Sequence, residues 1–309
     1  MTQTSPSPAT GTVLALQGGG AHGAFTWGAL DYLFEQGLRF DAVTGVSSGG
    51  IVGTMAVQGM VQSGPQGARE AISRLWTMVM DGNLLGNFPN TPFDWMWETT
   101  KMMSTDFAWN GFTNALRMFD PAMLNPLQQN PLEPLLHILL EPSLLCAPNA
   151  PRLYVSATDV ETGASTTFGN EQISIATLLA SACIPIMFPT IKIDGRSYWD
   201  GGYSCNPPLA PVLTPQPKRL ILIRAQVRQR HGVPTATANI VHRLHEIAYQ
   251  APLAAELSML PPTIELIDIP ADDALSHHPL NSTLNTDRRF IEGLFAAGRK
   301  EAARVFNKA

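Results

Sequence analysis

Cysteine, excess basic charge and long apolar runs are all scarce in this chain of 309 residues. Its three cysteines, Cys146, Cys183 and Cys205, are too few for a disulfide framework and match no zinc-site spacing, so we expect a reducing, cytoplasmic location and no metal. No run of about 18 apolar residues occurs, which excludes a typical membrane-spanning helix. With 20 basic and 25 acidic residues the net charge is −5, and we expect no nucleic-acid partner.

The composition that is present, 45% hydrophobic and 15% charged, is that of a globular protein with a large core. Residues 1–11 are rich in Thr, Ser and Pro, and they contain neither Lys nor Arg. We interpret them as a disordered leader rather than a secretory signal. Residues 12–309 are then expected to form a single α/β domain.

The order of apolar segments predicts a parallel sheet covered by helices. Short buried strands are expected at 12–16 and 40–44, and each is followed by glycines and then a helix, at 24–36 and from 51 to about 63. Further strands are predicted at 152–157, 166–168, 219–225 and 264–269, with a hairpin at 191–199 and helices at 173–183 and 286–307. We therefore expect a three-layer sandwich with a mostly parallel central sheet.

Residues 76–123 differ in character, because they hold four of the six tryptophans and seven of the twelve methionines. We predict a helical cap inserted at about 76–150. Such side chains suit a lid that contacts acyl chains, but apolar residues at helical spacing are more often ordinary core, and we favour that interpretation.

The glycine loop Gly18-Gly19-Gly20-Ala21-His22-Gly23 lies between a predicted strand and a predicted helix. Its exposed backbone N–H groups and the helix dipole favour negative charge. The spacing also fits a dinucleotide fingerprint, but Asp41 begins the second strand instead of ending it, which argues against a nucleotide. Two interpretations of the glycine loop remain: a tight turn without a ligand, and an oxyanion hole.

The segment Gly45-Val46-Ser47-Ser48-Gly49 fits the Gly-x-Ser-x-Gly nucleophile turn, at the junction of a strand and a helix. Ser47 has glycine on both sides at the required spacing, whereas Ser48 does not, and we interpret Ser48 as a small helix-start residue. A serine needs a base, and none of the seven histidines has a recognisable triad context. His277 or His278 keeps a Ser-His-Asp hydrolase open as an alternative.

An acidic candidate for the base is Asp200 in Tyr198-Trp199-Asp200-Gly201-Gly202, which by itself indicates only a turn. Glycine loop, Ser47 turn and Asp-Gly-Gly in this order resemble the patatin-like phospholipase family. The stretches 156–159, 180–185 and Asn206-Pro207 add to the resemblance, which covers about 12–225 and matches 76–150 poorly.

This resemblance implies a lipid or ester acyl hydrolase with Ser47 as nucleophile and Asp200 as base. The N–H groups of Gly18, Gly19, Gly20 and Ala21 would hold the oxyanion, and no cofactor is implied. His22 replaces the arginine or lysine of many relatives, so a fixed positive charge there is not expected. A lipid substrate would bring peripheral contact with a membrane. A catalytically inactive lipid-binding scaffold is the other alternative.

Overall fold

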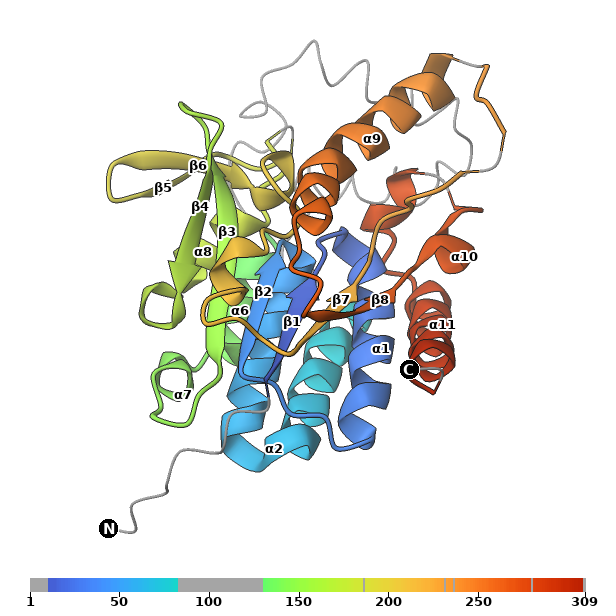
Figure 1. Cartoon of the computed structure of the whole chain (residues 1–309). Coiled ribbons are helices and arrows are strands. Elements are labelled where there is room, and N and C mark those ends of the chain that lie inside the picture. Colours follow the sequence, from blue (N-terminus) through green and yellow to red (C-terminus); the bar gives the residue numbers. More distant parts are fainter. Residues whose placement is uncertain are drawn as a thin grey trace, which may run out of the picture.

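The computed structural model describes residues 11–82 and 130–307, apart from Ile186, His231, Ala236 and Pro279. A sheet of eight strands lies at its centre, in the order β5-β6-β3-β2-β1-β7-β8, with β4 also paired to β3 (Figure 1). The strands are β1 Thr12–Leu16, β2 Ala42–Val46, β3 Arg152–Asp159, β4 Ser165–Gly169, β5 Ile191–Ile193, β6 Arg196–Asp200, β7 Arg219–Ile223 and β8 Glu265–Ile269.

The five strands β3, β2, β1, β7 and β8 run parallel, and the antiparallel pairs are confined to the side of β3 that carries β4, β6 and β5. All five residues of β1 are buried, as are those of β2. Strands covered on both faces have continuous apolar sequences, which is why the sequence predicts them so clearly. The predicted α/β fold with a parallel sheet centre is confirmed.

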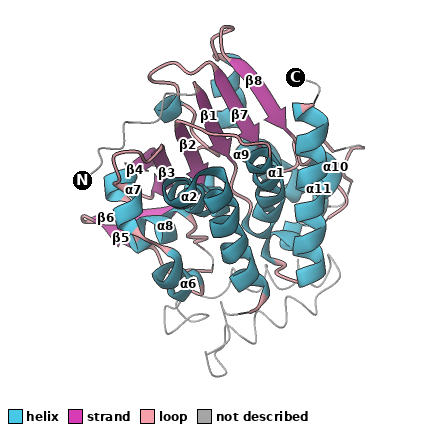
Figure 2. Ribbon diagram, turned by 90° about the horizontal axis from the view of Figure 1, so that it is seen from below, coloured by secondary structure: helices cyan, strands magenta, loops and turns pink. Residues whose placement is uncertain are grey.

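Most helices cover one face of the sheet, and Figure 2 shows α1, α2 and α11 there side by side. The α-helices are α1 Gly23–Glu35, α2 Ser48–Met80, α6 Leu132–Leu139, α7 Pro142–Leu145, α8 Ile175–Ser181, α9 Thr237–Ser258, α10 Asp272–Leu275 and α11 Arg288–Phe306. Short 3-10 turns also occur in the described part of the chain: η1 Gly20–His22, η2 Asn170–Gln172, η3 Gly201–Tyr203, η4 Ala210–Val212 and η5 Leu280–Leu284.

Alternating side chains of the central strands serve two separate cores. Leu14 and Leu16 join the core under α1, α2 and α11. Val13 and Ala15 face the opposite layer, which is thinner and contains Leu209 from the proline-rich segment together with Leu253 of α9. The sandwich therefore has a thick helical layer on one face and a mixed layer on the other.

Local signals placed several element ends correctly. The predicted hairpin turns at Asp194 and Gly195, whose φ angles of 50° and 80° are the left-handed pair of a type I′ turn. The helical conformation that begins at Ser48 ends at Ser63-Gly64-Pro65, as expected, because Ser63 and Gly64 have non-helical angles; a second helical segment follows within α2. Gly64 takes a φ of 65° there, and Pro65 restarts the helix, where the missing N–H costs nothing.

Two expectations fall largely or wholly outside the described residues. These are the leader, of which residues 1–10 are not described, and the cap, of which residues 83–129 are not described. Within the described part, residues 76–80 form the end of α2, and the Trp76 side chain is buried in the core. The long helix α9 had not been predicted.

Helices α1 and α11 cross at very close range through glycines. A Cβ atom added to Gly298 would overlap the carbonyl oxygen of Phe25, and one added to Gly28 would overlap that of Phe295. A Cβ atom added to Gly293, on the same helix as Gly298, would meet no other atom within 4 Å. The absence of a side chain at Gly298 is thus a packing requirement, whereas at Gly293 it is not.

We expect Gly298→Ala to destabilise the protein by about 1–3 kcal/mol, because the backbones of α1 and α11 must separate to admit the methyl group. Gly293→Ala is the matched control and should stabilise by about 0.5–1 kcal/mol through helix propensity. Urea unfolding of both variants measures this, and a Gly298→Ala variant as stable as Gly293→Ala would contradict the packing argument.

Candidate active site

Ser47 stands on a strained turn between β2 and α2. Its φ of 54° and ψ of −129° lie in a backbone region that residues other than glycine rarely adopt. Ser47 is also the N-cap of α2. The turn is tight, since a Cβ on Gly45 would lie 2.6 Å from the carbonyl oxygen of Gly49. The backbone N–H of Ser47 donates to Ser181 Oγ at 2.8 Å, and that hydroxyl donates to the Ser156 carbonyl at 2.8 Å.

Sheet register brings Asp200 to Ser47 although the two lie far apart in sequence. Val46 pairs with Ser156 of β3, and the next residue of β3, Ala157, pairs with Asp200 of β6. Ser47 and Asp200 therefore flank β3 at the same level, about 10 Å apart at the backbone because each strand spacing is about 4.8 Å. The side chains reach one another across this gap, because the Ser47 hydroxyl acts on the Asp200 carboxylate as a partner that lowers its pKa.

The Asp200 carboxylate is buried yet held in place. Its Oδ1 accepts the N–H of Gly202 at 2.8 Å, while its own N–H donates to the Cys183 carbonyl at 2.8 Å. Burial raises the pKa of Asp200 to about 6, against the opposing hydrogen bonds from Gly202 and Ser47. At pH 7 the group is therefore mostly ionised, and it is a stronger base than an ordinary aspartate.

The glycine loop is fixed by side chains from distant segments. Asn206 holds Gly18 from both sides, since its Oδ1 accepts the Gly18 N–H at 2.7 Å and its Nδ2 donates to the Gly18 carbonyl at 3.1 Å. The N–H of Gly19 donates to Ser48 Oγ at 3.1 Å. Ser48 is the first residue of α2, as expected, and it also joins the glycine loop to the nucleophile turn.

These bonds narrow the predicted set of oxyanion donors. The N–H groups of Gly18 and Gly19 are committed within the protein in this structure. Gly20 and Ala21 begin the η1 turn, where backbone N–H groups have no partner inside the helix, and both residues line the cavity beside Ser47. The remaining candidates are therefore Gly20 and Ala21.

A cavity of about 150 Å³ opens beside Ser47 and Ser48. Its walls are almost wholly apolar and come from α2, α6, the segment after α8 and the residues before α11. The principal side chains are Ile51, Val52, Leu75, Trp76, Val79, Leu132, Leu135, Met187, Phe188 and Leu284. A hydrocarbon group bound there would lie against the nucleophile turn.

The His22 side chain is buried, and its Nε2 forms a hydrogen bond with Ser282 Oγ at 2.8 Å. Burial lowers the pKa of His22 to about 4, so the imidazole is neutral at pH 7. Because it is neutral, it supplies no fixed positive charge beside the glycine loop.

The histidines kept open for a triad lie elsewhere. His278 packs its ring edge-on against Phe290 at 5.1 Å, and His277 is exposed. Among the histidine side chains that the structure describes, none is a hydrogen-bond partner of Ser47 or Asp200. The geometry thus favours a two-residue arrangement over the alternative with a histidine.

Asp41, the acidic residue weighed for a nucleotide, accepts the Gly11 N–H at 2.6 Å. Gly11 precedes β1 and the glycine loop follows it, so Asp41 lies at the opposite edge of the sheet. This position gives no support to a dinucleotide site.

Sequence reasoning did not assign a role to Ser181 or Asn206, which position the Ser47 turn and the glycine loop. Both lie in stretches that carried the family resemblance, and this was the available signal. Gln17 was also missed: its Nε2 donates to the Asn206 carbonyl at 3.1 Å, and its Oε1 accepts the Ala225 N–H at 3.2 Å.

Metal-binding and membrane-spanning features are both missing from the described residues. No group of three or more His, Cys, Asp or Glu side chains in 11–82 and 130–307 is arranged to hold a metal ion. In the same part of the chain, no helix combines the length and apolar character that crossing a bilayer requires. The three cysteines are free thiols.

Comparison with known proteins shows which solved structures this chain is similar to. No curated protein matches the chain. Among solved structures it is similar to VipD from Legionella pneumophila, with 14% identity and a TM-score of 0.48 over 96% of this chain and 67% of that one. It is also similar to ExoU of the type III secretion system of Pseudomonas aeruginosa, solved in complex with SpcU, with 15% identity and a TM-score of 0.31. That alignment covers 96% of this chain but only 53% of ExoU.

The model of one protein family, described as patatin-like phospholipase, matches residues 14–213. This span is well over half of the chain and includes the glycine loop, the Ser47 turn and Asp200. The protein therefore belongs to the patatin-like phospholipase family.

Proposed function

We propose that this protein hydrolyses carboxylic esters of lipids through an acyl-enzyme on Ser47, with Asp200 as the base. Family membership supports lipid acyl hydrolase activity. The observation that carries the finer proposal is the strand register that brings the Ser47 hydroxyl to the buried Asp200 carboxylate, beside an apolar cavity.

In the first half-reaction Asp200 accepts the Ser47 proton while Ser47 Oγ attacks the ester carbonyl. A carboxylate with a pKa near 6 suits this task, because it is ionised at neutral pH and more basic than a solvated aspartate. When the tetrahedral intermediate collapses, the C–O bond to the alcohol breaks, and the alcohol leaves with the proton from Asp200. Water then attacks the acyl-enzyme, with Asp200 accepting its proton. When this second intermediate collapses, the C–O bond to Ser47 breaks, Ser47 Oγ regains the proton from Asp200, and the fatty acid leaves.

The negative oxygen of each tetrahedral intermediate needs donors that are fixed in advance. The N–H groups of Gly20 and Ala21 have this role in our proposal, and the N-terminus of α2 adds a favourable dipole. One such donor is commonly worth about 3–4 kcal/mol in the transition state. Asn206 and Ser48 act indirectly, because they hold the glycine loop in position.

The acyl group is assigned to the apolar cavity. A cavity of about 150 Å³ accommodates a molecule of the size of benzene, about six carbon atoms. The carbons of the acyl chain nearest the ester would therefore be enclosed, with any longer tail lying beyond the cavity. A neutral His22 leaves no fixed charge in this part of the site.

Ser47→Ala and Asp200→Asn should each lower kcat on nitrophenyl esters by about 10⁴-fold, since nucleophile and base act as a unit. Ser48→Ala, the matched control, should lose no more than about tenfold, because its hydroxyl only orients Gly19. Burial disfavours the Asp200 charge, so Asp200→Asn should melt at or above the wild-type temperature at pH 7. An active Ser47→Ala variant would rule out Ser47 as the nucleophile.

The pH dependence of kcat/KM should follow the ionisation of Asp200. Only the carboxylate form accepts the proton, so activity falls as pH drops through the raised pKa of about 6. We expect a plateau above pH 7 and about a tenfold loss per pH unit below pH 6. A profile that stays flat down to pH 5 would show that Asp200 is not the base, provided that circular dichroism confirms folding at each pH.

The cavity assignment predicts a change of chain-length preference in Val79→Trp. Val79 is only partly buried and lines the cavity, so an indole fits there and shortens the space for the acyl chain. We expect kcat/KM to fall about tenfold or more for octanoyl esters and less than twofold for acetyl esters. Thr77→Trp, exposed on the same helix, is the control. Equal losses on both esters would place the acyl chain elsewhere.

A further inference from the structure

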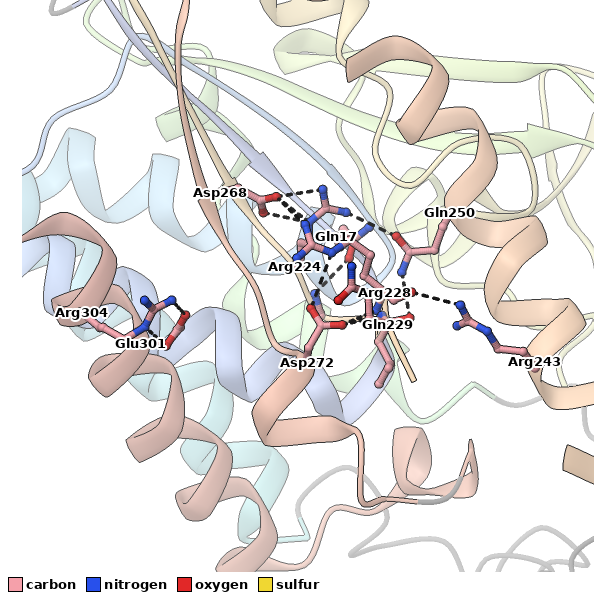
Figure 3. Close-up of polar contacts among 12 residues, drawn as sticks. Gln17, Arg224, Arg228, Gln229, Arg243, Gln250, Asp268, Asp272, Glu301 and Arg304 are labelled. Carbon is pink, nitrogen blue, oxygen red and sulfur yellow. Dashed lines mark hydrogen bonds and ion pairs between the residues drawn. The ribbon is translucent and has the colours of Figure 1, made fainter. Parts of the chain in front are cut away.

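Helix α9 has two different inward faces: Leu253 in its second half joins the core, whereas Glu246 and Gln250 nearer its start are polar and point inward. Glu246 is 7% exposed, and its carboxylate pairs with Arg230 at 2.8 Å and with Arg243 at 3.0 Å. Gln250 accepts from Arg224 at 3.3 Å and donates to the Val227 carbonyl at 3.2 Å. Figure 3 shows Arg243 and Gln250 reaching from α9 toward the segment that follows β7.

The outward face of the same helix is aliphatic. Ile240, Val241, Leu244 and Ile247 are 39%, 38%, 58% and 50% exposed. Their spacing of four and three residues places them along one stripe of the helix surface, which we call the α9 stripe. Both acidic residues of α9 lie off this stripe, since Glu246 is buried and Glu256 accepts the Leu209 N–H.

The α9 stripe belongs to a helix that is anchored beside the catalytic groups. Tyr249 of α9 packs against Tyr203 with ring centroids 5.3 Å apart, and its ring lies next to Gly202, the residue that donates to Asp200. Figure 1 shows α9 beyond the carboxyl ends of the central strands, the end at which β2 runs into the Ser47 turn. A surface that α9 contacts is therefore close to the end of the sheet that carries Ser47 and Asp200.

We propose that the α9 stripe docks the enzyme on a lipid surface, an inference that rests on the proposed function because the ester must come from such a surface. A stable protein interface needs roughly 800 Å² and 20–30 residues per partner, far more than four side chains on one helix. Protein hot spots also favour Trp, Tyr and Arg, which the stripe lacks. An interfacial helix needs only a buried apolar stripe and no matching partner shape.

The test is flotation with vesicles of equal parts phosphatidylcholine and phosphatidylglycerol, in a Ser47→Ala background so that the lipid stays intact. Adding Leu244→Asp and Ile247→Asp should weaken binding about tenfold or more, since both side chains would lose their contact with hydrocarbon. Leu266→Asp, at an exposed leucine of β8, is the control and should bind as the parent does. With native Ser47, the double variant should hydrolyse a soluble acetyl ester within twofold of wild type.

A second measurement does not depend on the folding of the charged variants. Leu244→Cys in a Cys146→Ser background, labelled with a polarity-sensitive dye, should shift to the blue on adding vesicles, whereas labelled Leu266→Cys should not. Equal binding by the double variant, or no dye shift, would overturn the proposal. So would a wild-type dimer, seen by light scattering, that the double variant dissociates, because the stripe would then contact a second copy. An inactive wild type that still binds vesicles through the stripe would contradict the hydrolase and not the docking surface.

Discussion

The position of β3 between β2 and β6 is the constraint on which the site depends. β2 runs parallel to β3 and β6 antiparallel, so the end of β2 and the end of β6 meet at neighbouring residues of β3. Ser156 and Ala157 thus fix the relative positions of Ser47 and Asp200. A slip by one residue in either pairing would point a side chain to the other face and separate the two groups.

The same arrangement gives the carboxylate its basicity at the expense of stability. Burial raises the pKa of Asp200 because the charged form loses solvation, and two hydrogen bonds recover only part of this loss. The folded protein therefore holds a group that would be more stable as a neutral one at pH 7. Strain at the Ser47 turn adds to this cost.

The polar side chains on the inward face of α9 are explained by the charged residues that follow β7. Arg224 follows β7 directly and is buried, where it pairs with Asp268 at 2.8 Å and with Gln250 of α9. A helix packed over charged groups must present polar residues to them, and its remaining face is then free to be apolar. Figure 3 shows this polar contact, and the α9 stripe lies away from it on the exposed face of the helix.

The sequence by itself determined the features that short segments encode. The buried strands, the glycine loop, the strained turn at Ser47 and the Asp194-Gly195 hairpin follow from local propensity and spacing, which act within a few residues. Only the tertiary structure decided that Asp200 reaches Ser47, that Asn206 and Ser48 occupy two predicted oxyanion donors, and that the apolar side chains in the first half of α9 face outward. These depend on strand order and on contacts between distant segments, and such contacts leave no periodic pattern in the chain.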